Sequence, residues 1–296
     1  MNNRLKVDLK KPLVNLTTDI VFSQYTRGYA NISLKMDILK PQSEEKLPVV
    51  VFVPGGGFTS SNKDAYVQQK LKIAESGYIV ASIEYRTIPD CVFPQPLQDV
   101  KSAVRYLRAH ADRFNIDKEN IAIMGNSAGG YLAALMGVTN GIEEFDKGEY
   151  LNEKSDIKAT IDIYGLSDLT SIGYGYPEIV QKVHKSPAAP EALWVHGMPL
   201  KTRQLGFGIN DDLEKAKKAN PITYISKNST PFLIMHGTED KLVSPNQTKI
   251  LHEALIEEGI ESTRYEVEGA AHGGIHWVQP EIINIIIEFL NKHLKK

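Results

Sequence analysis

The stretch that decides the fold of this chain is Ile121-Ala122-Ile123-Met124-Gly125-Asn126-Ser127-Ala128-Gly129-Gly130-Tyr131. Four apolar residues lead into a run of small ones, and an apolar, alanine-rich segment continues to Met136. The pattern predicts a buried strand, a sharp turn and a helix. Gly125 and Gly129 suit such a turn, because the strand and helix backbones come too close together for a Cβ atom.

Ser127 stands at the tip of this predicted turn. Between a strand and a helix, the arrangement Gly-x-Ser-x-Gly exposes the serine hydroxyl above the sheet. The next amide, that of Ala128, lies at the helix N-terminus, where unpaired N–H groups stabilise a developing negative charge. The pattern therefore predicts a nucleophilic serine, although a glycine–serine turn without any chemical role can have the same local sequence.

Length and composition narrow the class of protein. The 296 residues are 42% hydrophobic and 24% charged, which is typical of a globular protein able to bury a large core. A net charge of −2 does not favour nucleic acid or an anionic membrane as a partner. The single cysteine, Cys91, is expected to pack in the interior, and no Cys/His cluster has the spacing of a metal site.

The N-terminal segment 1–19 is polar and charged. It lacks the apolar core of a signal peptide, and no stretch of the chain approaches the roughly 18 apolar residues of a membrane span. We therefore expect a cytoplasmic protein. Its oligomeric state does not follow from the sequence.

Strands and helices are predicted to alternate along the chain. Residues 49–53, 78–83, 159–164 and 231–237 are almost continuously apolar, as strands covered on both faces are. Residues 32–38 alternate with period two, which indicates a half-buried antiparallel strand near an edge. In the intervening amphipathic helix, whose apolar positions run from Val100 to Leu107, we expect Lys101, Arg105 and Arg108 to form the solvent-exposed face. The order predicts one α/β domain over residues 1–296, with a mostly parallel sheet and helices on both faces.

The irregular segment 165–230 interrupts this alternation. It is rich in glycine and proline and carries the bulky aromatic residues Trp194 and Phe207. We interpret it as an insertion over the strand C-termini that acts as a lid or pocket wall. A plain surface excursion is the alternative.

Ser127, Asp240 and His272 follow one another along the chain in the order serine, aspartate, histidine. Asp240 and His272 each follow a predicted strand, and a parallel sheet gathers its strand C-termini at one edge. Histidine can accept a proton near neutral pH, and a carboxylate can orient the imidazole and stabilise its protonated form. Asp168 also follows a strand, but its local sequence is typical of a turn in which the acid caps its own backbone. We therefore predict Ser127, His272 and Asp240 as nucleophile, base and orienting acid.

A glycine-rich loop follows the strand at 49–53. Pro54-Gly55-Gly56-Gly57-Phe58 can turn several backbone amides toward one point, which favours an oxyanion-binding loop over a merely mobile turn.

Several stretches of the chain match one known family. They are Pro54–Phe58, Tyr85-Arg86, Pro96–Val100, Gly125–Gly130, Tyr164–Leu169, Pro221–Tyr224, His236–Asp240 and Ala271–Gly273. With these stretches, nearly all of the chain from about residue 18 onward resembles the α/β-hydrolases of the esterase/lipase group related to hormone-sensitive lipase. It is most similar to the bacterial feruloyl, acetylxylan and carboxylesterase-like members.

The resemblance implies the same triad, together with oxyanion donors at the amides of Gly56, Gly57 and Ala128. It implies a carboxylic ester hydrolase that needs no cofactor and no metal and that acts on a small-molecule ester with a short-chain, aryl, carbohydrate-linked acetyl or feruloyl group. Members of the family usually have histidine where this chain has Pro54; because the donors lie further along the loop, we expect the oxyanion site to survive without the anchor that histidine provides. A related acyl hydrolase, such as an arylformamidase or a small serine peptidase, is the nearest alternative. A non-catalytic binding protein on the same fold is another.

Overall fold

One eight-stranded sheet runs through the molecule, which is known here from a computed structural model that describes residues 2–203 and 205–295. The strands have the spatial order β1-β2-β4-β3-β5-β6-β7-β8. The pairs β1–β2 and β2–β4 are antiparallel, and every neighbouring pair from β4 to β8 in this order is parallel. The strands are β1 (Val14–Arg27), β2 (Ala30–Pro41), β3 (Leu47–Val53), β4 (Ile79–Ile83), β5 (Ile116–Asn126), β6 (Ala159–Ile163), β7 (Phe232–Gly237) and β8 (Ser262–Val267).

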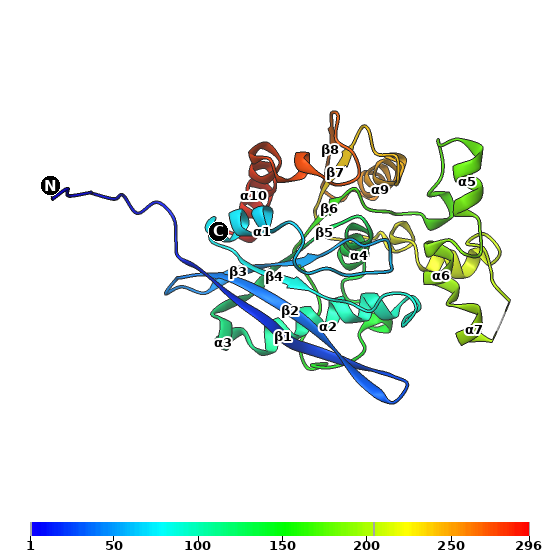
Figure 1. Cartoon of the computed structure of the whole chain (residues 1–296), viewed down its shortest axis with the longest axis horizontal. Coiled ribbons are helices and arrows are strands. Elements are labelled where there is room, and N and C mark those ends of the chain that lie inside the picture. Colours follow the sequence, from blue (N-terminus) through cyan, green and yellow to red (C-terminus); the bar gives the residue numbers. More distant parts are fainter. Residues whose placement is uncertain (1, 204, 296) are drawn as a thin grey trace.

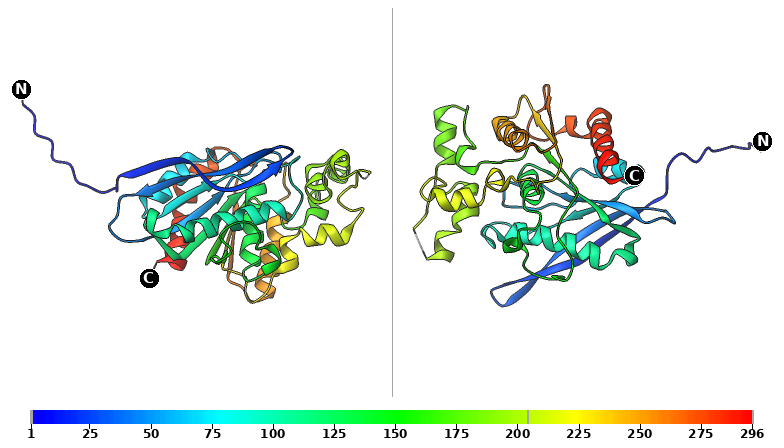
Figure 2. Two further views of the ribbon diagram at one scale, coloured as in Figure 1. Left: turned by 90° about the horizontal axis from the view of Figure 1, so that it is seen from below. Right: turned by 180° about the vertical axis from the view of Figure 1, so that it is seen from behind.

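Helices cover both faces of this sheet (Figures 1 and 2). The α-helices are α1 (Val67–Glu75), α2 (Gln95–Ala109), α3 (Ala111–Phe114), α4 (Ala128–Val138), α5 (Glu178–His184), α6 (Pro190–His196), α7 (Pro199–Thr202), α8 (Leu213–Lys218), α9 (Asn246–Glu257) and α10 (Pro280–Leu294). Four short 3₁₀ turns complete them, namely η1 (Glu143–Phe145), η2 (Leu169–Ser171), η3 (Pro221–Tyr224) and η4 (Ile275–Val278).

The core has two main layers because the buried strand residues alternate between the two faces. On one face, Val49 and Val51 of β3 pack with residues of α2 and α4. On the other face, Val50 and Phe52 pack with residues of α1 and α10. A smaller cluster lies between β7, α4 and α9. This arrangement explains the unbroken apolar runs and confirms the predicted α/β fold with a mostly parallel sheet.

The first strand is longer than the sequence indicates, because the sequence suggests a strand only over Asp19 to Tyr25. β1 begins at Val14, since residues 14–17 pair through their backbone with residues 38–41 of β2. Their side chains remain largely exposed, so no apolar pattern marks this part of the strand. Residues 2–13 extend from it as an exposed arm (Figure 1).

The prediction of a solvent-exposed basic face on α2 is wrong for Lys101 and Arg105, which are buried. The Lys101 ammonium donates to the Thr139 carbonyl and the Ser155 hydroxyl, at 3.1 and 3.0 Å. Arg105 pairs with Asp146 at 2.6 Å. The loop after α4 folds back over α2, so both cations find their partners in that loop instead of in solvent.

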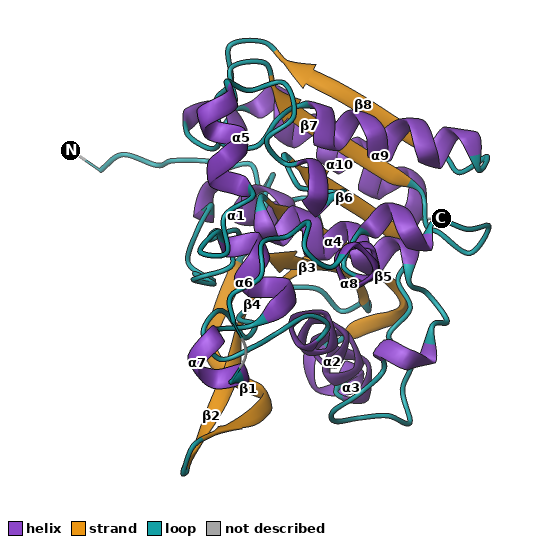
Figure 3. Cartoon of the chain, turned by 90° about the vertical axis from the view of Figure 1, so that its right-hand side faces the viewer, coloured by secondary structure: helices purple, strands orange, loops and turns teal. Residues whose placement is uncertain are grey.

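The segment between β6 and β7 lies at one end of the sheet (right in Figure 1) and carries α5, α6, α7 and α8 (Figure 3). Its parts differ in burial. No residue of α5 or α7 is buried, whereas Trp194 of α6 is completely inaccessible to solvent. The Trp194 ring packs against Phe58, with ring centroids 4.4 Å apart, and so fixes α6 to the glycine loop.

Candidate active site

Ser127 connects the end of β5 to the first turn of α4. It has the left-handed conformation φ 55°, ψ −125°, which is unusual for a residue with a side chain. A Cβ atom on Gly125 would lie 2.1 Å from the Gly129 carbonyl oxygen, and one on Gly129 would lie 2.0 Å from that of Val53. The elbow therefore requires glycine at both positions, for the steric reason that the sequence suggested.

Ser127, His272 and Asp240 lie in one hydrogen-bonded row. Nε2 of His272 is 2.8 Å from Oγ of Ser127, and Nδ1 of His272 is 2.7 Å from Oδ2 of Asp240. Because an ionised carboxylate can only accept, Nδ1 carries the hydrogen of the neutral imidazole. Nε2 is then free to accept the serine proton, as a general base must.

Asp240 is buried, and four donors surround its carboxylate. Oδ1 accepts from the amides of Leu242 and Val243, at 2.9 and 3.0 Å. Oδ2 accepts from His272 and, at 3.1 Å, from Nε2 of His236. Burial alone disfavours the charged form, but the hydrogen bonds from the two histidines and the backbone outweigh it and hold the pKa of Asp240 well below its usual range. The carboxylate is therefore ionised at neutral pH.

Asp168 does not join this row. Its Oδ1 accepts from the amide of Thr170 at 3.0 Å, from the Thr170 hydroxyl and from Nδ2 of Asn220. It caps the short turn η2, which is the local role that its sequence indicated.

The glycine loop lies directly beside the elbow. A Cβ atom on Gly55 would be 3.0 Å from Cβ of Ser127. The amide of Gly55 donates to Oδ1 of Asn126 at 3.1 Å, and the Tyr85 hydroxyl donates to the Pro54 carbonyl at 2.8 Å. These two bonds anchor the loop although Pro54 has neither a polar side chain nor an N–H group.

The amides of Gly56, Gly57 and Ala128 are not donors in any hydrogen bond assigned within the described residues. The carbonyl of Gly56 instead accepts from the amides of Thr59 and Ser60, which closes the turn. Gly57 has φ +56°, and Ala128 is the first residue of α4. Among the described residues, the three amides therefore have no partner that would compete with an oxygen of a bound molecule.

The sequence did not predict two contacts of the acid loop. From its position at the end of the apolar strand 231–237, His236 is expected only to pack in the interior; it is fully buried, but it also donates to Asp240. Tyr176 of the insertion donates to the Asp240 carbonyl at 3.0 Å. The four-residue spacing between His236 and Asp240, across a strand end and a turn, is the only signal that could have indicated the first contact.

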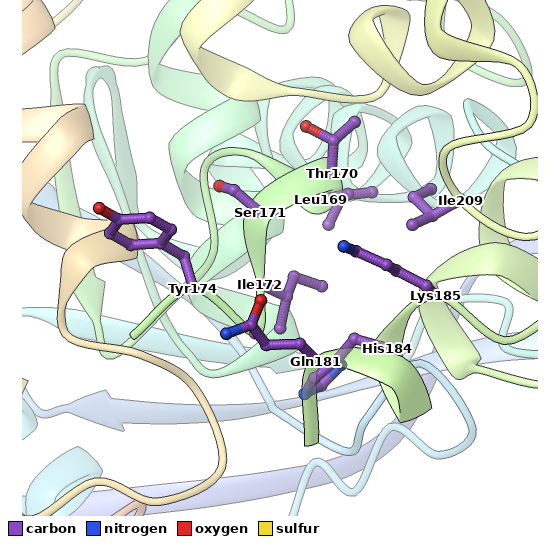
Figure 4. Close-up of a pocket in the computed structure, with 10 residues that line it drawn as sticks. Leu169, Thr170, Ser171, Ile172, Tyr174, Gln181, His184, Lys185 and Ile209 are labelled. Atoms are coloured by element: carbon purple, nitrogen blue, oxygen red, sulfur yellow. The ribbon is translucent and has the colours of Figure 1, made fainter. Parts of the chain in front are cut away.

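A small pocket of about 140 Å³ opens within the insertion (Figure 4). Polar side chains line it together with Ile172 and Ile209; they include Thr170 of η2, Gln181 of α5 and Lys185, which directly follows α5. None of the residues that line it belongs to the row of Ser127, His272 and Asp240.

The fold and the site together define an α/β-hydrolase. A family model described as BD-FAE matches residues 36–255, and the chain belongs to this family. The match includes Ser127 and Asp240 but ends before His272.

Curated proteins and solved structures agree with this assignment. The chain is 29% identical to "Esterase LipC" of Mycobacterium tuberculosis over 237 residues, which cover 79% of this chain and 55% of the relative. It is 25% identical to "Probable isoprenylcysteine alpha-carbonyl methylesterase ICMEL1" of Arabidopsis thaliana, with 90% of this chain and 55% of the relative covered. The chain thus spans about half the length of these curated relatives.

Two solved structures share the fold over almost the whole chain. A "Truncated form of carbohydrate esterase from gut microbiota" aligns with a TM-score of 0.80 at 23% identity, covering 98% of this chain and 99% of the other. A "Bifunctional GH43-CE" protein of Bacteroides eggerthii aligns with a TM-score of 0.79 at 29% identity, covering 94% of this chain and 35% of the other.

Residues 2–203 and 205–295 contain neither a membrane-spanning helix nor a cluster of metal ligands. No helix in this part of the chain is long and apolar enough to span a membrane. Nor do three or more His, Cys, Asp or Glu side chains gather there in a group that could hold a metal ion.

Proposed function

We propose that this protein hydrolyses carboxylic esters through a covalent acyl-enzyme on Ser127. The observation that carries the proposal is the continuous row of hydrogen bonds from Ser127 through His272 to Asp240. Such a row turns a weakly acidic hydroxyl into a nucleophile at neutral pH. The similarity to proteins named esterases supports the same chemistry.

The reaction has two halves. Ser127 Oγ attacks the ester carbonyl while Nε2 of His272 takes its proton, and the alcohol then leaves with that proton. A water molecule, activated by His272 in the same way, hydrolyses the acyl-enzyme and releases the acid. The ionised Asp240 stabilises the imidazolium formed in each half.

The oxyanion of each tetrahedral intermediate is assigned to the amides of Gly56, Gly57 and Ala128. The contact between the glycine loop and the elbow supports this assignment, as does the position of Ala128 at the N-terminus of an eleven-residue helix.

The substrate is proposed to be a small ester with a short or aryl acyl group, including acetyl or feruloyl groups attached to carbohydrate. A half-buried aromatic side chain close to the base supports it, since aromatic rings favour contact with aryl groups. Tyr66 is half-buried, and its hydroxyl bonds to that of Tyr164, whose buried ring lies 4.8 Å from the His272 ring.

The insertion 165–230 is proposed to form a fixed wall of the substrate pocket. Its α6 is fixed to the glycine loop by Trp194, and its Tyr176 is bonded to the acid loop. Both contacts place insertion residues against segments that carry the triad or the oxyanion amides.

The Ser127→Ala variant tests the proposal. We expect it to fold normally and to lose on the order of 10⁶ in kcat on p-nitrophenyl acetate, because the nucleophile is absent. A fluorophosphonate should label Ser127 of the natural protein, as located by peptide mass spectrometry, and should not label the variant. A folded Ser127→Ala protein with near wild-type turnover would end the serine-esterase proposal.

A substrate panel separates the alternatives. It should compare p-nitrophenyl esters of increasing acyl length, acetylated xylo-oligosaccharides, methyl ferulate, N-formylkynurenine and a short peptide amide. Ester turnover well above turnover of the formamide and the peptide supports the esterase. The reverse order favours the arylformamidase or the peptidase, and no turnover with any substrate favours a binding protein.

A further inference from the structure

Asn126 precedes the nucleophile and forms hydrogen bonds on both sides of its side-chain amide. Its Oδ1 accepts from the backbone N–H of Gly55 at 3.1 Å. Because that partner can only donate, it fixes which end of the amide is the oxygen. Nδ2 must then face the Tyr164 hydroxyl, 3.2 Å away, and donate to it. Asn126 is only 9% exposed, so little water competes for these bonds.

Tyr164 extends this connection to the base. Its ring centroid is 4.8 Å from that of His272, and its backbone amide donates to the Met235 carbonyl at 2.7 Å. The side chain is almost fully buried, and the residue has φ +43°. A bulky residue keeps such a conformation only where its surroundings hold it in place.

Tyr66 ends the connection next to the loop that carries the base. Its hydroxyl is 2.6 Å from that of Tyr164, and it too has a positive φ, of 55°. A Cβ atom on Gly273, the residue after His272, would lie 3.3 Å from the Tyr66 hydroxyl. One hydrogen-bonded chain, Gly55–Asn126–Tyr164–Tyr66, therefore runs from the glycine loop to the histidine loop.

We infer that Asn126 and Tyr164 are positioning residues that hold the oxyanion loop and the base in fixed places relative to Ser127. The inference rests on the proposed function. Pro54 cannot tie the loop to the strand that carries Ser127, and the Gly55–Asn126 bond makes that connection instead. When Asn126 is lost, the amides of Gly56 and Gly57 should drift from the oxyanion, and stabilisation of the transition state should suffer more than substrate binding.

Matched variants can test this. Asn126→Ala removes both bonds of the amide, Asn126→Asp keeps an acceptor for Gly55, and Tyr164→Phe keeps the ring beside His272 but removes its hydroxyl. Asn140→Ala is the control for the first variant, because Asn140 also forms two bonds, both to the backbone of Ile157. Tyr78→Phe is the control for the tyrosine, since within residues 2–203 and 205–295 the buried Tyr78 hydroxyl bonds only to Asn291.

The readout is the ratio of kcat/KM for an aryl acetate to that for the matching aryl thionoacetate. A developing S⁻ is larger and accepts hydrogen bonds less well than O⁻, so an intact set of oxyanion donors favours the oxygen ester. We expect Asn126→Ala to lose about 100-fold in kcat on the acetate, with KM nearly unchanged and a smaller loss on the thionoacetate. The ratio of kcat/KM for the acetate to kcat/KM for the thionoacetate should therefore fall.

The other variants should form a series. Asn126→Asp should retain most of the activity and of the ratio. Tyr164→Phe should lose about tenfold in kcat, the value of one hydrogen bond, and shift the ratio in the same direction. The two controls should leave the ratio unchanged, whatever they do to stability. If Asn126→Ala fails to fold, the same ratio measured for Tyr164→Phe tests the inference, and a wild-type ratio in that variant overturns it.

A folded Asn126→Ala protein with the wild-type ratio, or with equal losses on both substrates, would overturn the inference. Ser127→Ala keeps this failure separate from failure of the proposed function. An inactive Ser127→Ala beside an unchanged ratio rejects only the positioning role, whereas an active Ser127→Ala rejects the esterase itself.

Discussion

At the scale of single residues, we expect opposite results from substituting Asp168 and Asp240, the two acids that follow neighbouring strands. Asp240→Asn should preserve the fold and lose roughly 10⁴ in kcat, since an amide in that place favours the wrong imidazole tautomer. Asp168→Asn should retain most of the activity, because Asp168 bonds to Thr170 and Asn220 and not to His272. Steady-state kinetics with circular dichroism on both variants checks this.

The result that contradicts the assignment is also clear. If Asp168→Asn were inactive while Asp240→Asn turned over almost normally, the acid would be the wrong one. A loss of folding in either variant would be visible in the circular dichroism spectrum before any kinetics were interpreted.

The sequence predicted the residues of the candidate row but not the residues that support it. Ser127, Asp240 and His272 each stand in a short local pattern that can be interpreted without a structure. The bond from Asn126 to Tyr164 joins residues 38 positions apart, and the bond from Tyr66 to Tyr164 joins residues 98 apart. A local sequence pattern does not predict which distant hydroxyl group a side-chain amide will bond to. These two hydrogen bonds therefore became apparent only in the folded chain.

At the scale of elements, α6 should be more important than its neighbours in the insertion. Trp194→Ala should lower the free energy of unfolding by about 3–5 kcal/mol, because a fully buried ring leaves a large cavity. It should also lower kcat, since the ring supports Phe58 of the glycine loop. Urea unfolding followed by tyrosine and tryptophan fluorescence, with kinetics on p-nitrophenyl acetate, measures both effects.

Ile179→Ala is the matched control in the same insertion. Ile179 of α5 is 69% exposed, so the variant should change the free energy of unfolding by no more than about 0.5 kcal/mol. If Trp194→Ala were equally harmless, the insertion would be a surface excursion and not a wall.

The elements themselves were mostly predictable, and the exceptions have a physical cause. Continuous apolar runs marked β3, β4, β6 and β7, because each is covered on both faces. Burial of Lys101 and Arg105 was not predictable, since α2 alone presents them on its polar face. The loop that satisfies them begins at Thr139, beyond the next strand and helix.

At the scale of the whole molecule, one buried acid should make stability depend on pH. Asp162 of β6 is completely buried, and its Oδ2 has no hydrogen-bond partner within the described residues. Burial raises its pKa to about 7, although the Gly165 amide lowers it somewhat. Between about pH 4 and pH 7 the native state keeps a proton that the unfolded chain has released, so the free energy of unfolding falls as pH rises.

Asp162→Asn should remove this decrease of the free energy of unfolding with rising pH. The difference in unfolding free energy between variant and natural protein should shift in favour of the variant by at most about 4 kcal/mol from pH 4 to pH 8. Urea titrations of both proteins across that range give the difference directly. A constant difference would mean that Asp162 is ionised in the native state throughout.

The left-handed conformation of Ser127 has a consequence for any attempt to evolve this protein. Glycine adopts φ 55° freely, whereas a serine there costs on the order of 1–3 kcal/mol. The residue that the proposed chemistry needs most is therefore one that destabilises the fold relative to glycine at the same position. A laboratory selection for heat resistance alone would favour variants that replace it. Only a screen that couples survival to turnover would keep the serine in place.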